Sequence, residues 1–174
     1  MTKTPEKRAL TRRSLLQQSA ALGAIAISGA GFIAAPNAAW ALEVSEISEH
    51  QMATLLQMAR DIYPHDQVGD EYYVIAIKGY DSADSKDFVA EGVAKLDALA
   101  KDAGAANYLD TKWEDNRVAL LNQMEDDAFF QTVRGGLVTG LYNQKAVWPI
   151  FGYEGESFSK GGYLHRGFDD INWL

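Results

Sequence analysis

Between residues 45 and 142, apolar residues recur three and four positions apart, which is the period of an amphipathic α-helix. In the first such stretch Ser45 or Ser48 caps a helix that ends before Pro64, because the residue preceding a proline is disfavoured in helical conformation. The apolar stripe of this helix consists of Met52, Leu55, Leu56, Ala59, Ile62 and Tyr63. The pattern favours an all-α fold, in which each helix buries one face against other helices.

Three further stretches show the same period. Ser85 begins the first, which ends at Gly104, and the others run from about Thr111 to Met124 and from about Asp127 to Tyr142. The residues expected to face inward are Phe88, Val89, Val93, Leu96, Leu99, Ala100, Val118, Leu121, Met124, Phe129, Phe130, Val133, Leu137 and Leu141. The last stretch also contains Gly135, Gly136 and Gly140. Each glycine costs about 1 kcal/mol relative to alanine in a helix interior, so we expect another backbone to approach closely there.

Residues 72–80 (YYVIAIKGY) could form either a strand or a helix. Their β-branched content is typical of a buried strand, but no partner strand is evident elsewhere in the sequence. A lone strand would leave its backbone N–H and C=O groups unpaired, so we expect a short buried helix. The sequence therefore predicts an all-α domain over residues 42–146, built as a small bundle of four to five helices.

From Val147 to Leu174 the helical period stops, and glycine and aromatic residues become frequent. We expect an irregular C-terminal arm over residues 147–174. In one interpretation its rings pack on the helical domain. In the other, which we favour, they bind a partner protein, because aromatic residues and arginine are enriched at protein interfaces. The candidate partner-binding residues are Trp148, Phe151, Tyr153, Phe158, Tyr163, Arg166, Phe168 and Trp173.

Residues 1–41 carry the features of an export signal. A basic stretch containing Arg12 and Arg13 is followed by an uncharged, weakly apolar run over residues 20–35 and by the small-residue site Ala39-Trp40-Ala41. This order is typical of a secretory signal, and the paired arginines predict export to the periplasm by the twin-arginine (Tat) route. We expect cleavage after Ala41. The alternative is an uncleaved membrane anchor, although the apolar run is shorter than the roughly 20 residues that a spanning helix needs.

Composition limits the kinds of partner and chemistry. The chain has 16 basic and 24 acidic residues, and removing residues 1–41 would take away five basic residues and one acid, changing the formal charge from −8 to −12. Such acidity argues against nucleic acid and against anionic lipid as partners. The chain has no cysteine, which excludes a disulfide, covalent c-type haem and cysteine-ligated iron–sulfur clusters.

No group of residues in the sequence predicts catalysis by this chain alone. There is no G-x-S-x-G, P-loop or dinucleotide fingerprint, and His50, His65 and His165 lack the spacing of a metal site. The acid pairs Asp126-Asp127 and Asp169-Asp170 are better explained by the favourable placement of acids at helix starts. We therefore expect no catalytic, cofactor-binding or metal-binding residue in this chain.

Several short motifs together resemble a known family. A Tat signal precedes a helix that ends in Ile62-Tyr63-Pro64-His65-Asp66, and Tyr142-Asn143 precedes Trp148 and the stretch Phe151-Gly152-Tyr153-Glu154-Gly155. This pattern resembles the small subunits of periplasmic flavoprotein dehydrogenases, in particular gluconate 2-dehydrogenase subunit 3. It is more distantly similar to the small subunits of sorbitol, fructose and glucose dehydrogenases.

The resemblance implies a non-catalytic accessory subunit. In such complexes a large flavoprotein of the glucose–methanol–choline (GMC) type holds FAD and oxidises an alcohol or sugar. A cytochrome c subunit, where present, carries the electrons away, and the small subunit assists folding and Tat co-export of the large one. Two alternatives stay open: a free-standing periplasmic enzyme with His65-Asp66 or His165 and Asp169 as acid–base groups, and a carbohydrate-binding module with an aromatic platform on the arm.

Overall fold

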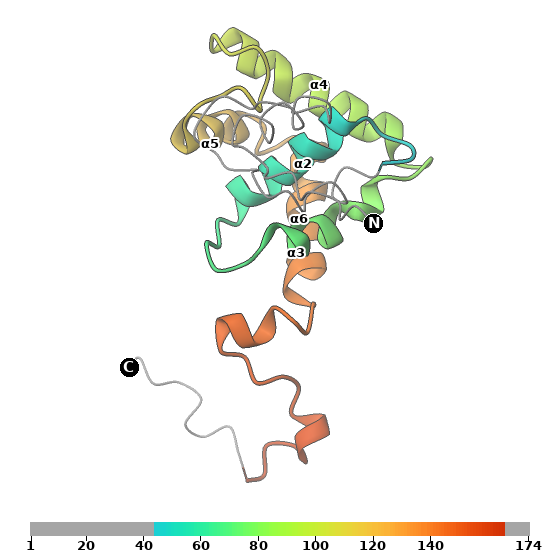
Figure 1. Cartoon of the computed structure of the whole chain (residues 1–174), viewed down its shortest axis with the longest axis vertical. Helices are drawn as coiled ribbons and strands as arrows, with labels where there is room; N and C mark the ends of the chain where they lie inside the picture. Colours follow the sequence, from blue (N-terminus) through green and yellow to red (C-terminus); the bar gives the residue numbers. More distant parts are fainter. Residues whose placement is uncertain (1–43, 166–174) are drawn as a thin grey trace, which may run out of the picture.

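The computed structural model of the chain describes residues 44–165, and within them all regular structure is helical (Figure 1). The five α-helices are α2 (Glu49–Ile62), α3 (Asp70–Ile77), α4 (Lys86–Asp102), α5 (Glu114–Gln123) and α6 (Ala128–Tyr142). Three short 3-10 helices are η2 (Lys78–Tyr80), η3 (Trp148–Phe151) and η4 (Phe158–Lys160). The predicted all-α bundle is confirmed for this part of the chain. The predicted export signal and its predicted cleavage site at Ala41 lie outside the described residues.

The helix ends follow local sequence signals. Ser48, rather than Ser45, caps α2: its hydroxyl accepts a hydrogen bond from the Gln51 N–H at 3.2 Å, and the Gln51 side chain accepts one from the Ser48 N–H at 2.7 Å. This reciprocal capping box pairs two N–H groups that a helix start leaves unpaired. Gly104 follows the end of α4 with a φ of +89°, a conformation that suits glycine at a helix end.

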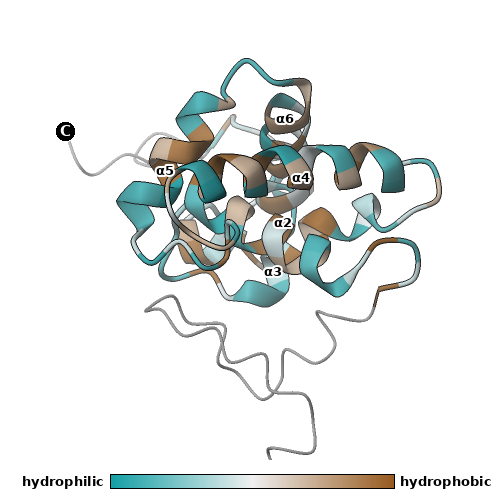
Figure 2. Ribbon diagram, turned by 90° about the horizontal axis from the view of Figure 1, so that it is seen from above, coloured by the Kyte–Doolittle hydropathy of each residue, from teal (hydrophilic) through white to brown (hydrophobic). Residues whose placement is uncertain are grey.

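One core joins the helices, and α2 lies at its centre, in contact with α3, α4, α5 and α6 (Figure 1). Hydrophobic residues of every α-helix contribute to this core, while hydrophilic residues cover much of the outer surface (Figure 2). The prediction for α5 is wrong in one detail, since Val118 is only half-buried. Helix α5 starts at Glu114 instead of near Thr111, and its buried face carries Arg117, Leu120 and Leu121.

The glycines of α6 differ in what they contact. A Cβ on Gly140 would lie 3.0–3.1 Å from Ala76 of α3, backbone atoms included, so this glycine does admit a close backbone as expected. A Cβ on Gly136 would lie 2.5 Å from the Tyr80 hydroxyl, which is a side-chain contact. Gly135 faces open space. The expectation of a close backbone is therefore right for Gly140 and wrong for Gly135.

Residues 72–80 are helical, as predicted, with α3 continuing into η2. The helix is buried on one side only, since Tyr73, Val74 and Ile77 lie in the core while Ile75 is 59% exposed. Asp81 follows and ties the start of the described chain to this region. Its carboxylate accepts hydrogen bonds from the N–H groups of residues 45, 46 and 47 at 2.8–3.1 Å.

The C-terminal arm leaves the end of α6 and extends away from the helical body, residues 44–146 (Figure 1). Over its described residues, 147–165, it is irregular apart from η3 and η4, which the sequence pattern did not predict. Each of these turns ends at a glycine with positive φ, Gly152 at +73° and Gly161 at +83°. The glycines thus adopt a left-handed conformation in which other residues would be strained.

Candidate partner interface

The base of the arm is fixed to the helical body by polar contacts at the end of α6. The Gln144 side-chain amide donates hydrogen bonds to the carbonyl of Tyr72 in α3 at 2.8 Å and to that of Gly140 at 2.7 Å. Val147 is fully buried, and Ile150 packs against the same core. The arm therefore starts from a defined position on the body.

Trp148 organises the proximal loop of the arm, residues 147–156. Its indole N–H donates to the Tyr142 carbonyl at 2.8 Å, and its ring meets the edge of the Tyr153 ring at a centroid distance of 5.2 Å. Gly155, at a φ of +96°, lies against the indole, where a Cβ would come within 3.4 Å. The Lys145 ammonium lies 5.8 Å from the Trp148 ring centroid. Trp148 is thus engaged within its own chain.

His65, in the connector between α2 and α3, also contacts the base of the arm. Its Nε2 lies 2.5 Å from the Tyr142 hydroxyl, and its ring centroid is 4.8 Å from that of Phe151. Tyr63 meets the Tyr142 ring edge-on at 5.7 Å. Burial, and then the nearby charge of Arg60, lower the pKa of His65, so the packed arrangement favours the neutral imidazole.

The distal turn of the arm, residues 157–165, exposes apolar side chains. Phe158 is 94% exposed, Leu164 77% and Tyr163 65%. A backbone hydrogen bond nevertheless closes the turn, because the Gly162 N–H donates to the Ser157 carbonyl at 2.7 Å. Lys160 fastens the turn to the proximal loop through the carbonyl of Glu154 and, at 3.3 Å, its carboxylate. The turn therefore presents large apolar groups from a defined backbone.

The structure separates the sequence-predicted interface residues into three groups. Trp148, Phe151 and Tyr153 contact one another or the body, although Phe151 and Tyr153 remain about half exposed. Phe158 and Tyr163 point to solvent from the distal turn. The remaining predicted residues, Arg166, Phe168 and Trp173, and the signal residues Arg12 and Arg13, lie outside the described part of the chain.

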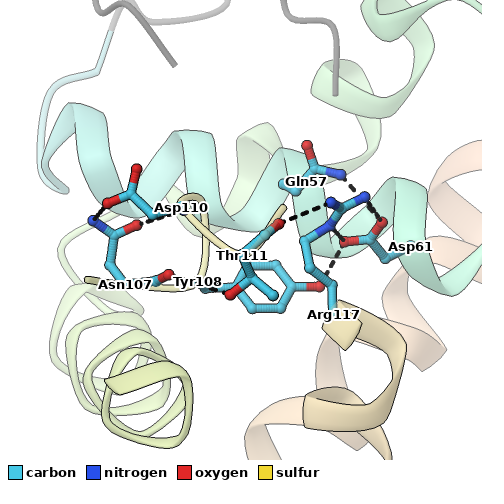
Figure 3. Close-up of polar contacts among 7 residues, drawn as sticks. All are labelled: Gln57, Asp61, Asn107, Tyr108, Asp110, Thr111 and Arg117. Carbon is cyan, nitrogen blue, oxygen red and sulfur yellow. Dashed lines mark hydrogen bonds and ion pairs between the residues drawn. The ribbon is translucent and has the colours of Figure 1, made fainter. Parts of the chain in front are cut away.

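The sequence pattern did not predict Leu164, the third exposed side chain of the distal turn. It also did not predict a buried ion pair in the body. In that pair the guanidinium of Arg117 grips the carboxylate of Asp61 through two hydrogen bonds of 2.7 and 2.8 Å (Figure 3). Both side chains are buried, with exposed fractions of 8% and 3%. Arg117 could have been recognised from its position three and four residues before Leu120 and Leu121, on the buried face of α5. Asp61, in contrast, lies outside the apolar stripe predicted for α2.

Besides Arg117, two neighbouring side chains donate hydrogen bonds to the Asp61 carboxylate. The Tyr108 hydroxyl donates to it at 2.6 Å and the Gln57 amide at 3.1 Å, so its two oxygens accept four hydrogen bonds (Figure 3). Burial, and then the charge of Asp61, raise the pKa of Tyr108. Tyr108 therefore keeps its proton near neutral pH. The arrangement joins α2 to α5 and to the loop before it, a structural role.

The other titratable candidates also serve local structure. Asp127 caps α6 by accepting from the Phe129 N–H at 2.8 Å, which lowers its pKa, and it pairs with Lys95. His50 Nε2 lies 2.7 Å from an Asp97 carboxylate oxygen across α2 and α4. Residues 44–165 hold no group of three or more histidine, aspartate and glutamate side chains arranged to bind a metal.

No helix in this part of the chain is long and apolar enough to cross a lipid bilayer. Comparison with models of known protein families, with curated proteins and with solved structures found no match to this chain. Function is therefore inferred from the sequence motifs and from the geometry of the arm.

Proposed function

We propose that this chain is the non-catalytic small subunit of a periplasmic FAD-dependent sugar or alcohol dehydrogenase complex. It binds the GMC-type flavoprotein large subunit and assists its folding and Tat co-export. The observation that carries the proposal is the arm, which holds Phe158 and Tyr163 in solvent on a turn extended from the body (Figure 1). Exposed aromatic groups on an ordered segment are typical of interface anchors.

The polar contacts of the body support a binding role over a catalytic one. The Asp61 carboxylate is saturated by Arg117, Tyr108 and Gln57. His65, one acid–base candidate of the free-standing-enzyme alternative, contacts Tyr142 and Phe151 at the base of the arm. These groups hold the fold together, and catalysis needs groups that can reach a substrate.

In this proposal each subunit of the complex has its own task. The large subunit holds FAD and oxidises the substrate, and a cytochrome c subunit, where present, takes the electrons. This chain contributes the Tat signal with Arg12 and Arg13, and the arm that binds the large subunit. Folded export suits such a cargo, because a cofactor inserted in the cytoplasm is retained only by a folded protein. The proposal predicts a gene for a GMC-type flavoprotein beside the gene for this chain.

The test is export of that flavoprotein when it is co-expressed with the full chain. Changing Arg12→Lys together with Arg13→Lys is expected to leave both proteins in the cytoplasm, measured as FAD-dependent dye reduction in periplasmic and cytoplasmic fractions. The matched control changes the neighbouring charges conservatively, Lys7→Arg with Arg8→Lys, and should export normally. Equal periplasmic activity with and without the twin arginine would overturn the export role.

A further inference from the structure

The two halves of the arm differ in how their large side chains are used. In the proximal loop, the indole N–H of Trp148 is paired within the chain and its ring lies against Gly155 and Tyr153. In the distal turn, Phe158 and Leu164 are 94% and 77% exposed. Trp148 is therefore engaged by intramolecular contacts, although Phe151 and Tyr153 of the same loop are about half exposed, whereas the distal turn leaves most of its apolar surface in water.

We infer that the distal turn is a preformed anchor that inserts Phe158, Tyr163 and Leu164 into an apolar groove on a folded protein partner. Trp148 is a positioning residue that holds the turn in place without itself entering the groove. The inference rests on the proposed function for the identity of the partner. Compared with the interface predicted from the sequence, it adds Leu164 and excludes Trp148 from direct contact with the partner.

The backbone of the turn supports a preformed anchor. The Ser157 carbonyl accepts hydrogen bonds from the N–H groups of Gly162 at 2.7 Å and Lys160 at 3.1 Å. Gly161 and Gly162 have φ values of +83° and +79°, which other residues rarely adopt. Lys160 bonds to Glu154 and so joins the turn to the proximal loop. A segment ordered before binding loses less conformational entropy when it binds.

Charge favours a protein partner over a membrane or a second copy. Segments that lie on anionic membranes carry clustered Lys and Arg beside their apolar residues. The described arm carries Glu154 and Glu156 against the single cation Lys160, and the whole chain has a formal charge of −8. A second copy would bring the same negative charge. A partner with an apolar groove and a neutral or basic rim fits this surface.

The experiment places p-benzoylphenylalanine, a photo-crosslinking residue, singly at Phe158, Tyr163 or Trp113 of the full chain in its native host. Trp113 is the matched control, because it is 65% exposed on the helical body, the same fraction as Tyr163. We expect adducts with one protein, identified by mass spectrometry, at Phe158 and Tyr163 but not at Trp113. Leu164→Ala and Trp148→Ala, each added to the Phe158 probe, should lower the adduct yield by about tenfold. Far-UV circular dichroism checks that these variants fold.

The identity of the adduct separates the two proposals. An adduct with a flavoprotein supports both. An adduct with one protein that binds no FAD supports the anchor and contradicts the proposed function. Adducts only with lipid or with this chain itself, equal yields at Trp113, or no adduct at either arm position would overturn the anchor, even if the flavoprotein still needs Arg12 and Arg13 for export. Unchanged yield with Leu164→Ala and Trp148→Ala would overturn the roles given to these two residues.

Discussion

The helical body and the arm of this protein obtain their order in different ways. The body buries one apolar core around α2 and fastens it with the Asp61–Arg117 pair. The described part of the arm, residues 147–165, buries few side chains, and its shape depends on Trp148, on His65 and on glycines with positive φ. The body is therefore expected to fold as a cooperative unit, whereas the arm should open and close at a much smaller free-energy cost. This separation suits a subunit whose body is a platform and whose arm binds.

The largest effect is expected from breaking the buried ion pair of the body. Asp61→Ala leaves the Arg117 guanidinium buried without its carboxylate, so the free energy of unfolding should fall by about 3–5 kcal/mol in urea titrations. The matched control is Glu91→Ala, which removes an exposed partner of Lys95 and should change stability by at most about 1 kcal/mol. A loss below about 1 kcal/mol for Asp61→Ala would contradict the structural role of the pair.

Next in size is a pair of glycine substitutions in the body. A Cβ on Gly92 of α4 would lie 2.1 Å from the buried ring of Phe129, so Gly92→Ala should destabilise the body by about 2 kcal/mol through overpacking. Gly135 of α6 faces open space, and Gly135→Ala should raise stability by about 0.5–1 kcal/mol because alanine favours the helix. Thermal unfolding followed by circular dichroism measures both. Stability changes of the same sign for the two variants would contradict the surroundings described for Gly92 and Gly135.

A smaller, pH-dependent effect is expected at Asp81. The N–H of Glu46 is the main group that holds the pKa of this carboxyl far below its usual 3.8; burial opposes it, and Lys78 and two further N–H groups assist. A pKa lower in the folded state gives stability that is present above pH 3.8 and is lost as the pH falls through the folded value. Asp81→Asn should therefore reduce stability more at pH 7 than at pH 2. Equal losses at both pH values would show that the charge of Asp81 is not what stabilises its contact with residues 45–47.

The smallest effect concerns the arm alone. The pKa of His65 is lowered from 6.5 by burial and by Arg60, so the contacts of the neutral ring with Tyr142 and Phe151 should weaken as the pH falls below 6.5. Arg60, Asp66, Tyr63, Tyr73 and Tyr142 are the other titratable groups around this ring or its connector. Limited proteolysis should cut the arm faster at pH 5 than at pH 7.5, while the body stays intact.

Replacing His65 by Asn should remove that pH dependence from the cleavage rate. The protease must be compared at each pH on an unrelated peptide, so that its own pH profile is subtracted. If the His65→Asn variant keeps the pH dependence, another group controls the opening of the arm.

The fold was largely predictable because its main determinant is local. The apolar period over residues 45–142 predicted the helices, and Pro64 and Gly104 marked two of their ends. Gln51, at the third helical position, is the feature that distinguishes Ser48 from Ser45 as the cap of α2. Such signals depend on residues a few positions apart, so a single sequence contains them.

The parts that could not be predicted depend on contacts between distant residues. Asp61 and Arg117 are 56 residues apart, and the helical period gives no means of pairing charges across the bundle. Composition likewise groups Trp148 with Phe158, because both are aromatic residues of the arm. Only the three-dimensional contacts show that Trp148 bonds to the Tyr142 carbonyl while Phe158 faces solvent.

The central claim, that the body is a platform and the arm binds the partner, is tested most directly by truncation. The chain ending at Pro149 and the full chain would each be co-expressed with the proposed flavoprotein partner, and the complex would be measured by size-exclusion chromatography with light scattering. The account predicts a complex with the full chain only, and the same helical circular dichroism for both forms. A truncated chain that still binds the flavoprotein, or one that loses its helical structure, would contradict the account.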